Sequence, residues 1–391
     1  MRRWTSRRGP LAPVPLLLVA AAGGIVACTS PDAPVAPTEG SGASPGSARA
    51  AQGGGAPVYL VTFRDDVTDV RGLANALARR GGFTLASVRE HAARGFTAVV
   101  PPAFVDQLRA DPRVLIVEQD GPVSLDLPRE AARPGGGGGS GQSVSYGLTR
   151  VGGSVDGTGK TAWIIDTGID LAHPDLNTTR ACHASFVRTT TPDDGNGHGT
   201  HVAGVIAAKN NTIGTLGIAA NAYVCAVRVL DNAGSGQWSW IIEGVNYVAR
   251  NGRSGEVANM SLGGSGTNAT LEKAVLDASG VVKFAIAAGN SGANAANYTP
   301  ARVNGPNVYT VSAVDSRDCM ASWSNWGNPP VDYAAPGVGI LSLYKGGGTK
   351  SLSGTSMASP HVAGLLLSGG VRANGSACND PDGNPDPIAH R

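Results

Sequence analysis

Hydrophobic positions in the early part of the chain follow the periods of short strands and amphipathic helices. Apolar runs predict strands at Val58–Phe63, Gly95–Val100 and Val114–Glu118, and helical spacing predicts helices at Val70–Arg80 and Pro102–Ala110. This order indicates a βαββαβ-like arrangement, as in small split βαβ domains. We therefore expect a small α+β domain over residues 57–125.

A second pattern begins near residue 144. Short apolar strands alternate with helical stretches from there onward, which is typical of a parallel sheet flanked by helices. The clearest strand is Thr161–Asp166, an apolar run that ends in a carboxylate. A buried parallel strand would place Asp166 at its carboxyl end, in the crevice where such sheets bind ligands. Residues 144–391 are therefore predicted to form an α/β domain.

Stretches without periodicity separate these units. Residues 29–56 are almost entirely Ala, Pro, Gly, Ser and Thr, so we expect a disordered linker over residues 28–56. A second, glycine-rich linker is expected over residues 126–143. Its Gly136, Gly138 and Gly141 have the spacing of a dinucleotide fingerprint, but neither the strand before it nor the helix after it is present. That match is spurious.

The first 27 residues have the features of an export signal. Four arginines precede a short apolar run at Leu16–Ala20, and prolines interrupt a segment that is too short to span a membrane. Ile25–Cys28 is similar to the lipobox of bacterial lipoproteins, in which Cys28 would be lipidated. An ordinary export signal with a chance cysteine remains the alternative. Either interpretation predicts a protein that acts outside the cytoplasm.

Composition excludes several classes of protein. Of the 391 residues, 41% are hydrophobic, enough for a sizeable core, and 15% are charged, below the roughly 25% of ordinary domains. The 56 glycines lack the three-residue period of collagen. The net charge of +2 depends on the first eight residues, without which 27 basic residues stand against 29 acidic ones. Nucleic acid is therefore not expected as a partner.

Three segments carry side chains suited to nucleophilic catalysis. Besides Asp166, a helix that opens within Asn196–Gly204 carries His198, and Pro360 indicates a helix that starts at about Ser356. Taken singly, each has a simpler interpretation: Asp166 could cap a turn and Ser356 could cap a helix. His198 and His201 are also spaced for zinc, although the His-Glu-x-x-His arrangement of zinc proteases is absent.

Taken together, the three side chains fit one reaction. A serine hydroxyl needs an imidazole to take its proton, and a carboxylate must fix the tautomer of that imidazole. The segments Asp166–Asp170, His198–Gly204 and Gly354–Pro360 resemble the three signatures of the subtilase family of serine endopeptidases, most closely its proteinase K-like branch. The order Asp, His, Ser along the chain is also the order of the catalytic triad in subtilisin.

The resemblance implies a role for each residue. Asp166 would orient His198, His198 would act as general base and then acid, and Ser356 would be the nucleophile. Asn290 would donate to the oxyanion together with the Ser356 backbone N–H. The expected substrate-binding residues form two backbone edges and a small uncharged pocket wall: Gly234, Ser235, Gly236, Ser261, Leu262, Gly263, Ala287 and Gly289. Such main-chain recognition implies broad specificity for protein or peptide substrates.

The resemblance also implies structural features. Residues 57–125 look like a subtilase propeptide, an intramolecular inhibitor removed by self-processing, and the enzyme is expected to be a secreted monomer without a catalytic cofactor. In that fold, Cys182 would lie on a strand beside Cys225 and pair with it, which leaves Cys319 with Cys378; free cysteines are the alternative. A structural calcium ion would bind the carbonyls of Pro306 and Val308 and the carboxylate of Asp332, unless Asp332 merely caps a loop.

Two alternative functions were considered, and the chain differs from the family in one feature. A lipase or esterase would need Gly-x-Ser-x-Gly after a strand and the order Ser, Asp, His, and neither is present. A catalytically dead binding protein would be expected to lack a triad member, and none is missing. The chain after the Ser356 helix is shorter than in proteinase K-like enzymes, which leaves the covering of one sheet face in doubt. Its acidic residues 380–386 are expected to form a solvated tail rather than a calcium loop.

Overall fold

The computed structural model describes residues 56–125 and 141–391. The expected export signal, Cys28, nearly all of the first linker and most of the glycine-rich linker lie outside the described residues.

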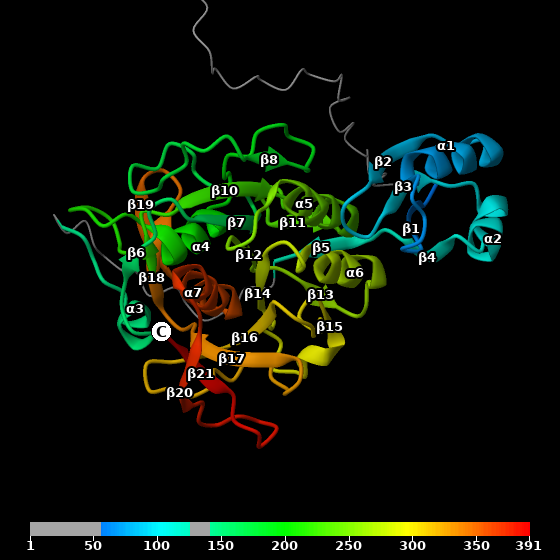
Figure 1. Ribbon diagram of the computed structural model, residues 1–391. Helices are drawn as coiled ribbons and strands as arrows, with labels where there is room; N and C mark the ends of the chain where they lie inside the picture. Colours follow the sequence, from blue (N-terminus) through cyan, green and yellow to red (C-terminus); the bar gives the residue numbers. More distant parts are fainter. Residues whose placement is uncertain (1–55, 126–140) are drawn as a thin grey trace, which may run out of the picture. The chain divides into compact units, whose positions relative to one another are not determined.

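Residues 57–125 form a four-stranded antiparallel sheet with two helices (Figure 1). The elements are β1 (Val58–Phe63), α1 (Val70–Gly81), β2 (Leu85–Arg89), β3 (Gly95–Val99), α2 (Pro102–Ala110) and β4 (Val114–Gln119), with sheet order β2-β3-β1-β4. Their own hydrophobic core includes Phe63, Leu77, Phe96 and Leu108. The predicted βαββαβ order is therefore present. Strand β2 was not among the predicted elements because four of its five residues are only partly buried.

A nine-stranded sheet organises the rest of the described chain. Its order is β20-β21-β17-β16-β14-β12-β7-β10-β8, and every neighbouring pair except β20 with β21 is parallel. The strands are β7 (Thr161–Asp166), β8 (Ala184–Ser185), β10 (Tyr223–Arg228), β12 (Val257–Met260), β14 (Lys283–Ala287), β16 (Val308–Val314), β17 (Val331–Pro336), β20 (Arg372–Ser376) and β21 (Pro387–His390). The predicted parallel α/β architecture is confirmed.

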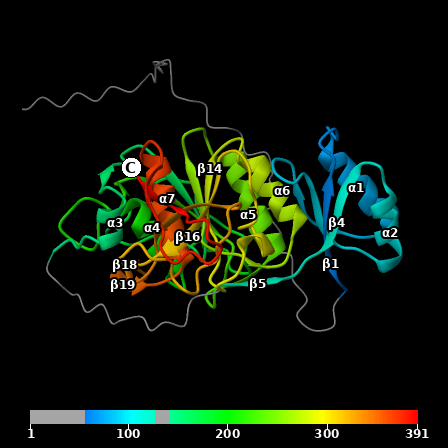
Figure 2. The ribbon, with the colours of Figure 1, turned by 90° about the horizontal axis from the view of Figure 1, so that it is seen from below.

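Helices cover both faces of this sheet (Figure 2). Alternate strand residues divide between two cores: Ala162 and Ile164 pack with α4 (His198–Ala207) and α7 (Thr355–Ser368). Trp163 and Ile165 pack with α5 (Trp238–Asn251) and α6 (Ala269–Ala278) on the other face. Since strands buried on both faces must be apolar throughout, this explains the continuous apolar run of β7.

The remaining elements are short. They are β5 (Pro122–Ser124), α3 (Tyr146–Arg150), β6 (Val155–Asp156), β9 (Ala219–Ala220), β11 (Ser235–Gln237), β13 (Gly264–Ser265), the 3-10 helix η1 (Ala295–Asn297), β15 (Tyr298–Thr299), β18 (Ile340–Tyr344) and β19 (Gly348–Leu352). The hairpin β18–β19 packs against α4 through Leu343.

The prediction of a solvated acidic tail holds for residues 381–385, which are exposed, but not for Asp386 or for the chain that follows it. After α7 the chain adds β20 and β21 to one edge of the nine-stranded sheet, where Ile388 pairs with Ala334 of β17. Asp386 is completely buried, and its Oδ2 accepts a hydrogen bond of 2.5 Å from the Ser312 hydroxyl. The sequence analysis missed β21 because this strand is short and directly follows the acidic residues.

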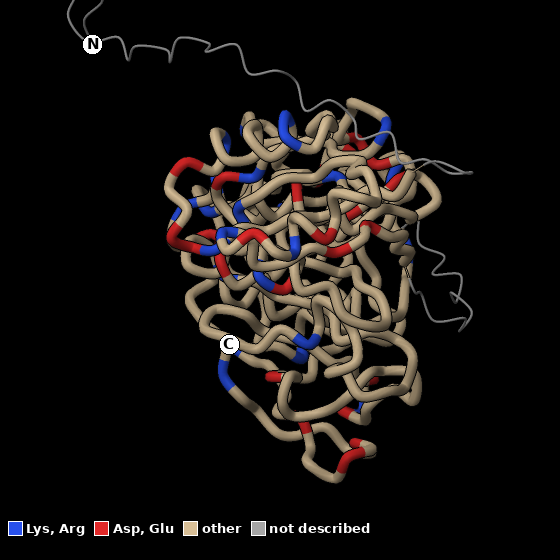
Figure 3. Tube along the Cα trace, turned by 90° about the vertical axis from the view of Figure 1, so that its right-hand side faces the viewer, with Lys and Arg blue, Asp and Glu red and all other residues tan. Residues whose placement is uncertain are grey.

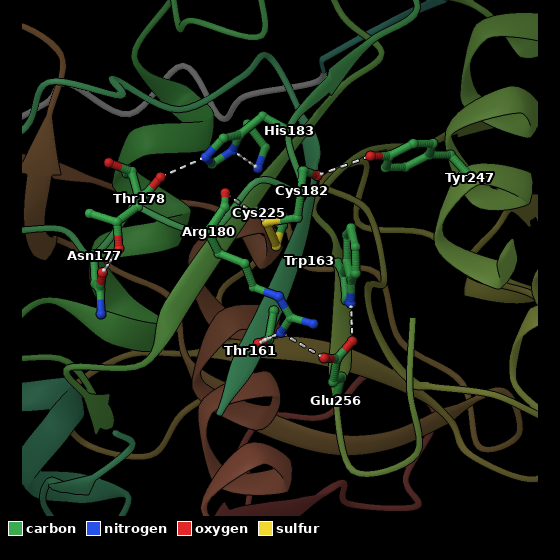
Figure 4. The surroundings of a disulfide bond; sticks show 12 residues. Thr161, Trp163, Asn177, Thr178, Arg180, Cys182, His183, Cys225, Tyr247 and Glu256 are labelled. Atoms are coloured by element: carbon green, nitrogen blue, oxygen red, sulfur yellow. Dashed lines mark hydrogen bonds and ion pairs between the residues drawn. A yellow bond between two sulfur atoms is a disulfide. The ribbon is translucent and has the colours of Figure 1, made fainter. Parts of the chain in front are cut away.

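Both expected disulfides are formed. Cys182 is bonded to Cys225 with a Cα–Cα distance of 5.4 Å, and Cys319 to Cys378 with a distance of 4.3 Å. Cys182 lies just before β8 and not on a strand as expected. Figure 4 shows the first disulfide near Glu256, which accepts hydrogen bonds from Trp163 and Arg180.

Charged residues are unevenly distributed along the trace: many lie in the upper part of Figure 3, and the lower part is mostly uncharged. None of the helices within residues 56–125 and 141–391 has the length and apolarity needed to cross a bilayer.

Candidate active site

Asp166 and His198 meet at the carboxyl edge of the sheet. Asp166 is the last residue of β7, and His198 is the first residue of α4. The His198 Nδ1 atom lies 2.8 Å from Asp166 Oδ1 and 3.0 Å from Oδ2. Both side chains are at most 1% exposed. The carboxylate therefore fixes Nδ1 as the protonated nitrogen and leaves Nε2 as the base.

The pKa of His198 reflects two opposing effects. Burial disfavours the charged imidazolium, but the negative charge of Asp166 and its hydrogen bond outweigh burial and raise the pKa above its ordinary value. Among the described residues, His198 Nε2 has no hydrogen-bond partner. This nitrogen is available to accept a proton.

Asp194, which the sequence analysis did not single out, anchors the start of α4. Its Oδ1 accepts hydrogen bonds from the backbone N–H groups of Asn196 and Gly197. Its Oδ2 accepts from the Thr200 backbone N–H and hydroxyl. A carboxylate at a helix N-terminus satisfies N–H groups that lack helical partners. The signal in the sequence was an aspartate four residues before His198.

Ser356 is the second residue of α7 and is 4% exposed. Its hydroxyl donates to the backbone carbonyl of Ser261 at 3.2 Å, and so it is not bonded to His198 in this structure. Because catalytic hydrogen bonds are often loose without substrate, this geometry does not argue against the expected role. At the second position of a helix, the Ser356 backbone N–H has no acceptor within the helix.

The amide of Asn290 is held in one orientation by Thr355. Asn290 Oδ1 accepts from the Thr355 backbone N–H at 2.8 Å and from its hydroxyl at 2.9 Å. The Thr355 hydroxyl in turn accepts from the Gly289 backbone N–H. Two donors on the oxygen assign the other end of the amide as NH₂. Thr355 was not among the predicted site residues, although it directly precedes Ser356.

A cavity of about 320 Å³ lies beside these groups. Seven of the twelve predicted catalytic and substrate-binding residues line it: Ser261, Leu262, Gly263, Ala287, Gly289, Asn290 and Ser356. The sequence analysis missed other lining residues, among them Ser265, Tyr298 and Thr299. No acidic or basic side chain lines the cavity among the residues described, in agreement with the small uncharged wall that was predicted.

Gly234, Ser235 and Gly236 lie outside that cavity, on and just before β11. Strand β11 pairs antiparallel with β5, so that Ser235 faces Ser124 and Gly236 faces Val123. Leu125 also donates its backbone N–H to the Gly234 carbonyl at 2.9 Å. This edge therefore binds an extended segment of the chain itself.

The expected calcium ligands lie at β16 and β17. Asp332 Oδ2 accepts from the Thr310 backbone N–H at 2.8 Å, and burial raises the pKa of Asp332. Val308 is the first residue of β16 and pairs with Phe284 of β14. Within the described residues, no group of three or more His, Cys, Asp or Glu side chains is placed to hold a metal ion.

The zinc interpretation of the two histidines does not fit this arrangement. His201 Nε2 lies 3.0 Å from the carbonyls of both Ile340 and Lys350. Burial lowers the pKa of His201 to about 3, so it is neutral at ordinary pH. Its ring is engaged by the β18–β19 hairpin.

Comparisons with known proteins agree with one another. The model of the subtilase family matches residues 157–368. The chain is 44% identical over 295 residues to alkaline serine exoprotease A of Vibrio alginolyticus, a match that covers 71% of this chain and 52% of that protein. The chain thus spans about half the length of that relative. It is 38% identical over 307 residues to proteinase R of Parengyodontium album, with 73% of each chain covered.

Two further matches extend the comparison. Subtilisin E of Bacillus subtilis (strain 168) is 43% identical over 288 residues, which covers 69% of this chain and 70% of that protein. A solved structure described as a cold adapted subtilisin-like serine proteinase superimposes with a TM-score of 0.56 and 38% identity. That match covers 63% of this chain and 97% of the other.

Proposed function

Because the chain belongs to the subtilase family of serine endopeptidases, we propose that it hydrolyses peptide bonds through an acyl-enzyme on Ser356 and is made as a precursor that processes itself. The observation that carries this proposal is the Asp166–His198 pair, whose Nε2 has no partner in the described part of the chain, together with a buried serine at a helix N-terminus. The substrate would be a protein or peptide.

In the proposed reaction, Ser356 Oγ forms a bond to the carbonyl carbon of the scissile peptide while its proton passes to His198 Nε2. The C–N bond then breaks, and the imidazolium returns the proton to the leaving amine. Water attacks the acyl carbon next, again losing a proton to Nε2. Cleavage of the ester returns that proton to Ser356 Oγ and releases the carboxylic acid.

Asn290 would stabilise the oxyanion that forms in both steps. Its oxygen accepts from Thr355, and its side chain lines the cavity, so its NH₂ group is the end of the amide that would donate to the oxyanion. The Ser356 backbone N–H, at the positive end of α7, would be the second donor. Both donors belong to the protein before substrate arrives, which is what electrostatic stabilisation of a transition state requires.

Broad specificity follows from recognition of the backbone. The β11 edge already pairs with an extended segment, and the absence of a side chain at Gly234 leaves room for Leu125 of that segment. The uncharged cavity wall of Ala287, Ala288 and Gly289 favours an apolar side chain before the cleaved bond.

Three contacts of residues 57–125 support an inhibitory propeptide. Strand β5 occupies the β11 edge, and Ser124 lines the cavity beside Ser356. Glu118 accepts hydrogen bonds from the backbone of Ala269 and Thr270 at the start of α6. Asp120 likewise accepts from the Ser239 backbone N–H in the first turn of α5. A precursor held in this way would exclude other substrates until residues 57–125 are removed.

We also propose the structural calcium site at Asp332. The carboxylate is half-buried and accepts a hydrogen bond from the Thr310 backbone N–H; Val308, at the start of β16, and Pro306 would supply the carbonyls. Carboxylate and carbonyl oxygens are the ligands that calcium prefers. The ion would tie β16 to β17 and would take no part in the reaction.

Secretion is proposed for the mature enzyme, with the precursor anchored by a lipid on Cys28. Cleavage between about residues 125 and 142 would separate that anchor from the catalytic domain. Fractionation of cells that export the parent and its Ser356→Ala variant tests this step. We expect a membrane-bound variant and a released parent; an exported variant that is wholly soluble and carries no lipid on Cys28 would end the idea.

A serine-phosphonylating probe tests the reaction itself. The parent should be labelled on Ser356 and hydrolyse casein, whereas Ser356→Ala should be unlabelled, inactive and isolated as the full precursor. His198→Ala should be similarly impaired, and the double variant should be no worse, since triad members act as a unit. Equal casein hydrolysis by parent and Ser356→Ala would reject the assignment, and a correctly folded parent that the probe does not label would favour a binding protein.

A further inference from the structure

A chain of buried hydrogen bonds connects β12 to α7 behind the nucleophile. The Ser359 hydroxyl donates to Asn259 Oδ1, Asn259 Nδ2 donates to Ser261 Oγ, and the Ser261 hydroxyl donates to the backbone carbonyl of Ser356. Each of the three distances is 2.8 Å. The side chains of Asn259, Ser261 and Ser359 belong to residues that are at most 1% exposed.

Pro360 explains why this chain ends on the Ser356 carbonyl. In a regular α-helix, the carbonyl of residue 356 would accept from the N–H of residue 360. Pro360 lies inside α7 and has no N–H. A buried carbonyl without a hydrogen-bond partner destabilises the folded protein. The hydroxyl of Ser261, the residue that directly follows β12, supplies the missing donor.

The same proline sets the direction of every hydrogen bond in the chain. Because the Ser261 hydroxyl has one proton and gives it to Ser356 O, its oxygen must accept from Asn259. The Asn259 amide must then present NH₂ to Ser261 and its oxygen to Ser359. Reversing the amide would leave the Ser356 carbonyl without this donor. One arrangement is therefore favoured, and the peptide unit that follows Ser356 is held in it.

We propose that Ser261 acts through its side chain as a positioning residue for the nucleophile, with Asn259 and Ser359 holding Ser261 in place. This inference rests on the proposed function of Ser356. Holding the Ser356 carbonyl fixes the backbone of that residue, and with it the direction of both Oγ and the N–H that would face the oxyanion. The backbone carbonyl of Ser261 accepts from Ser356 Oγ as well, so one residue restrains the nucleophile at two points.

Ser261→Ala in the full chain tests the proposal. A displacement of the attacking oxygen by about 1 Å is enough to slow acylation by about 100-fold. We expect kcat for a peptide substrate to fall by about 10- to 100-fold, with KM within about twofold, because the substrate-binding backbone is unchanged. Self-processing should slow in parallel. The phosphonylating probe should still label every molecule, but more slowly, and the pH midpoint of the reaction should stay that of the parent.

Ser279→Ala is the matched control. Ser279 also carries a buried hydroxyl that donates to a helix carbonyl, that of Leu276 at 2.8 Å, but it lies at the end of α6 and lines no part of the cavity. This variant should keep the kcat of the parent. If Ser261→Ala does not fold, Ser359→Ala, which removes the far end of the chain, should lower kcat by about three- to tenfold. When both fold, the double variant should be close to Ser261→Ala alone, since the two act on the same atoms.

Two results would overturn the proposal while leaving the proposed function intact. One is a foldable Ser261→Ala, or Ser359→Ala in its place, with a kcat within twofold of the parent. The other is a lower activity caused only by a smaller fraction of labelled molecules, since that would show loss of folded protein rather than loss of position. A parent that neither reacts with the probe nor cleaves peptides would overturn this inference together with the proposed function.

Discussion

Asn290 shows how a neutral side chain can be given a direction by its neighbours. An isolated amide can rotate by half a turn, so its NH₂ group would face the substrate only part of the time. Thr355 removes that freedom by placing two donors on Asn290 Oδ1. The Gly289 N–H then occupies the Thr355 hydroxyl oxygen, which directs the hydroxyl proton to Asn290.

Replacing Asn290 with alanine should remove one oxyanion donor. Loss of one such donor typically costs about 2.7–4 kcal/mol, so kcat should fall by about 100- to 1000-fold with little change in KM. Steady-state kinetics on a peptide substrate would measure this. Asn251→Ala is the control, because Asn251 is exposed at the end of α5, and its kcat and KM should equal those of the parent. A kcat for Asn290→Ala within about fivefold of the parent would remove Asn290 from the reaction.

The site residues that could be predicted from the sequence are those that react, and the ones that could not be predicted are those that position other groups. Asp166, His198 and Ser356 carry chemistry that few combinations of side chains supply, so type and order were informative. Asp194 acts through hydrogen bonds from backbone N–H groups, and Thr355 acts through hydrogen bonds to the Asn290 amide oxygen; aspartate and threonine make such bonds throughout proteins. Their importance becomes visible only when the folded chain shows which groups they hold.

The helix α4 and the turn after β7 fit together because of one glycine. A Cβ at Gly199 would lie 2.1 Å from the carbonyl oxygen of Gly168 and 3.2 Å from the Asp166 Cβ. The Gly199 N–H also donates to the Thr167 hydroxyl, which in turn donates to Asp194. Close approach of backbone to backbone is therefore what brings His198 to Asp166.

Elements with a strong hydrophobic period were predictable, and edge elements were not. The bounds of β1, β7 and α2 agree with their predicted ranges because apolar residues fill their buried sides. Strand β21 was missed because only two of its four residues, Ile388 and Ala389, are buried. Strand β20, which lies at the edge of the sheet beside β21, has no buried residue, so its hydrophobic pattern is weaker still.

The bulge between β16 and β17 is where we predict a dependence on calcium. The register of the two strands shifts between Thr310 and Val311, next to the Asp332 hydrogen bond. If the ion binds there, chelation should lower Tm without immediate loss of turnover. A bound ion stabilises the folded protein by about 2.7 kcal/mol when its free concentration is 100 times Kd.

Asp332→Ala should remove that gain in Tm, whereas Asp382→Ala, in the acidic loop before β21, should keep it. Thermal unfolding with calcium and with a chelator would compare the two variants. The opposite result, a calcium response that survives in Asp332→Ala and disappears in Asp382→Ala, would place the ion in the acidic loop.

Buried titratable groups make the stability of the folded protein depend on pH in two opposite ways. Burial lowers the pKa of His201 to about 3 and of His361 to about 4. Below pH 6.5, the ordinary pKa of histidine in the unfolded chain, these histidines bind protons in the unfolded protein but not in the folded one. The free energy of unfolding therefore falls as the pH decreases from about 6.5.

Burial raises the pKa of Asp386 to about 7, and the charges of Asp380 and Asp382 contribute. The contribution of Asp386 to the free energy of unfolding is fully present below the pKa that this carboxyl has in the unfolded chain. It is lost as the pH rises through about 7.

Asp386→Asn should separate these two contributions. At pH 8 the parent must keep a buried carboxylate charged, at a cost of up to about 4 kcal/mol, whereas the amide is neutral at any pH. The amide can still accept from the Ser312 hydroxyl, and its NH₂ replaces Asp386 Oδ1, which has no partner among the described residues. We therefore expect the variant to melt a few degrees above the parent at pH 8.

At pH 4 Asp386 is protonated in the folded parent, so the two proteins should differ much less, and both should lose stability below pH 6.5 through the two histidines. Calorimetry on the Ser356→Ala background, which avoids self-digestion, would measure Tm across this range. An advantage of Asp386→Asn that is equal at pH 4 and pH 8 would show that its effect is packing and not charge. A variant less stable than the parent at pH 8 would show that the carboxylate is charged and stabilised there, and that the tail holds a partner for it.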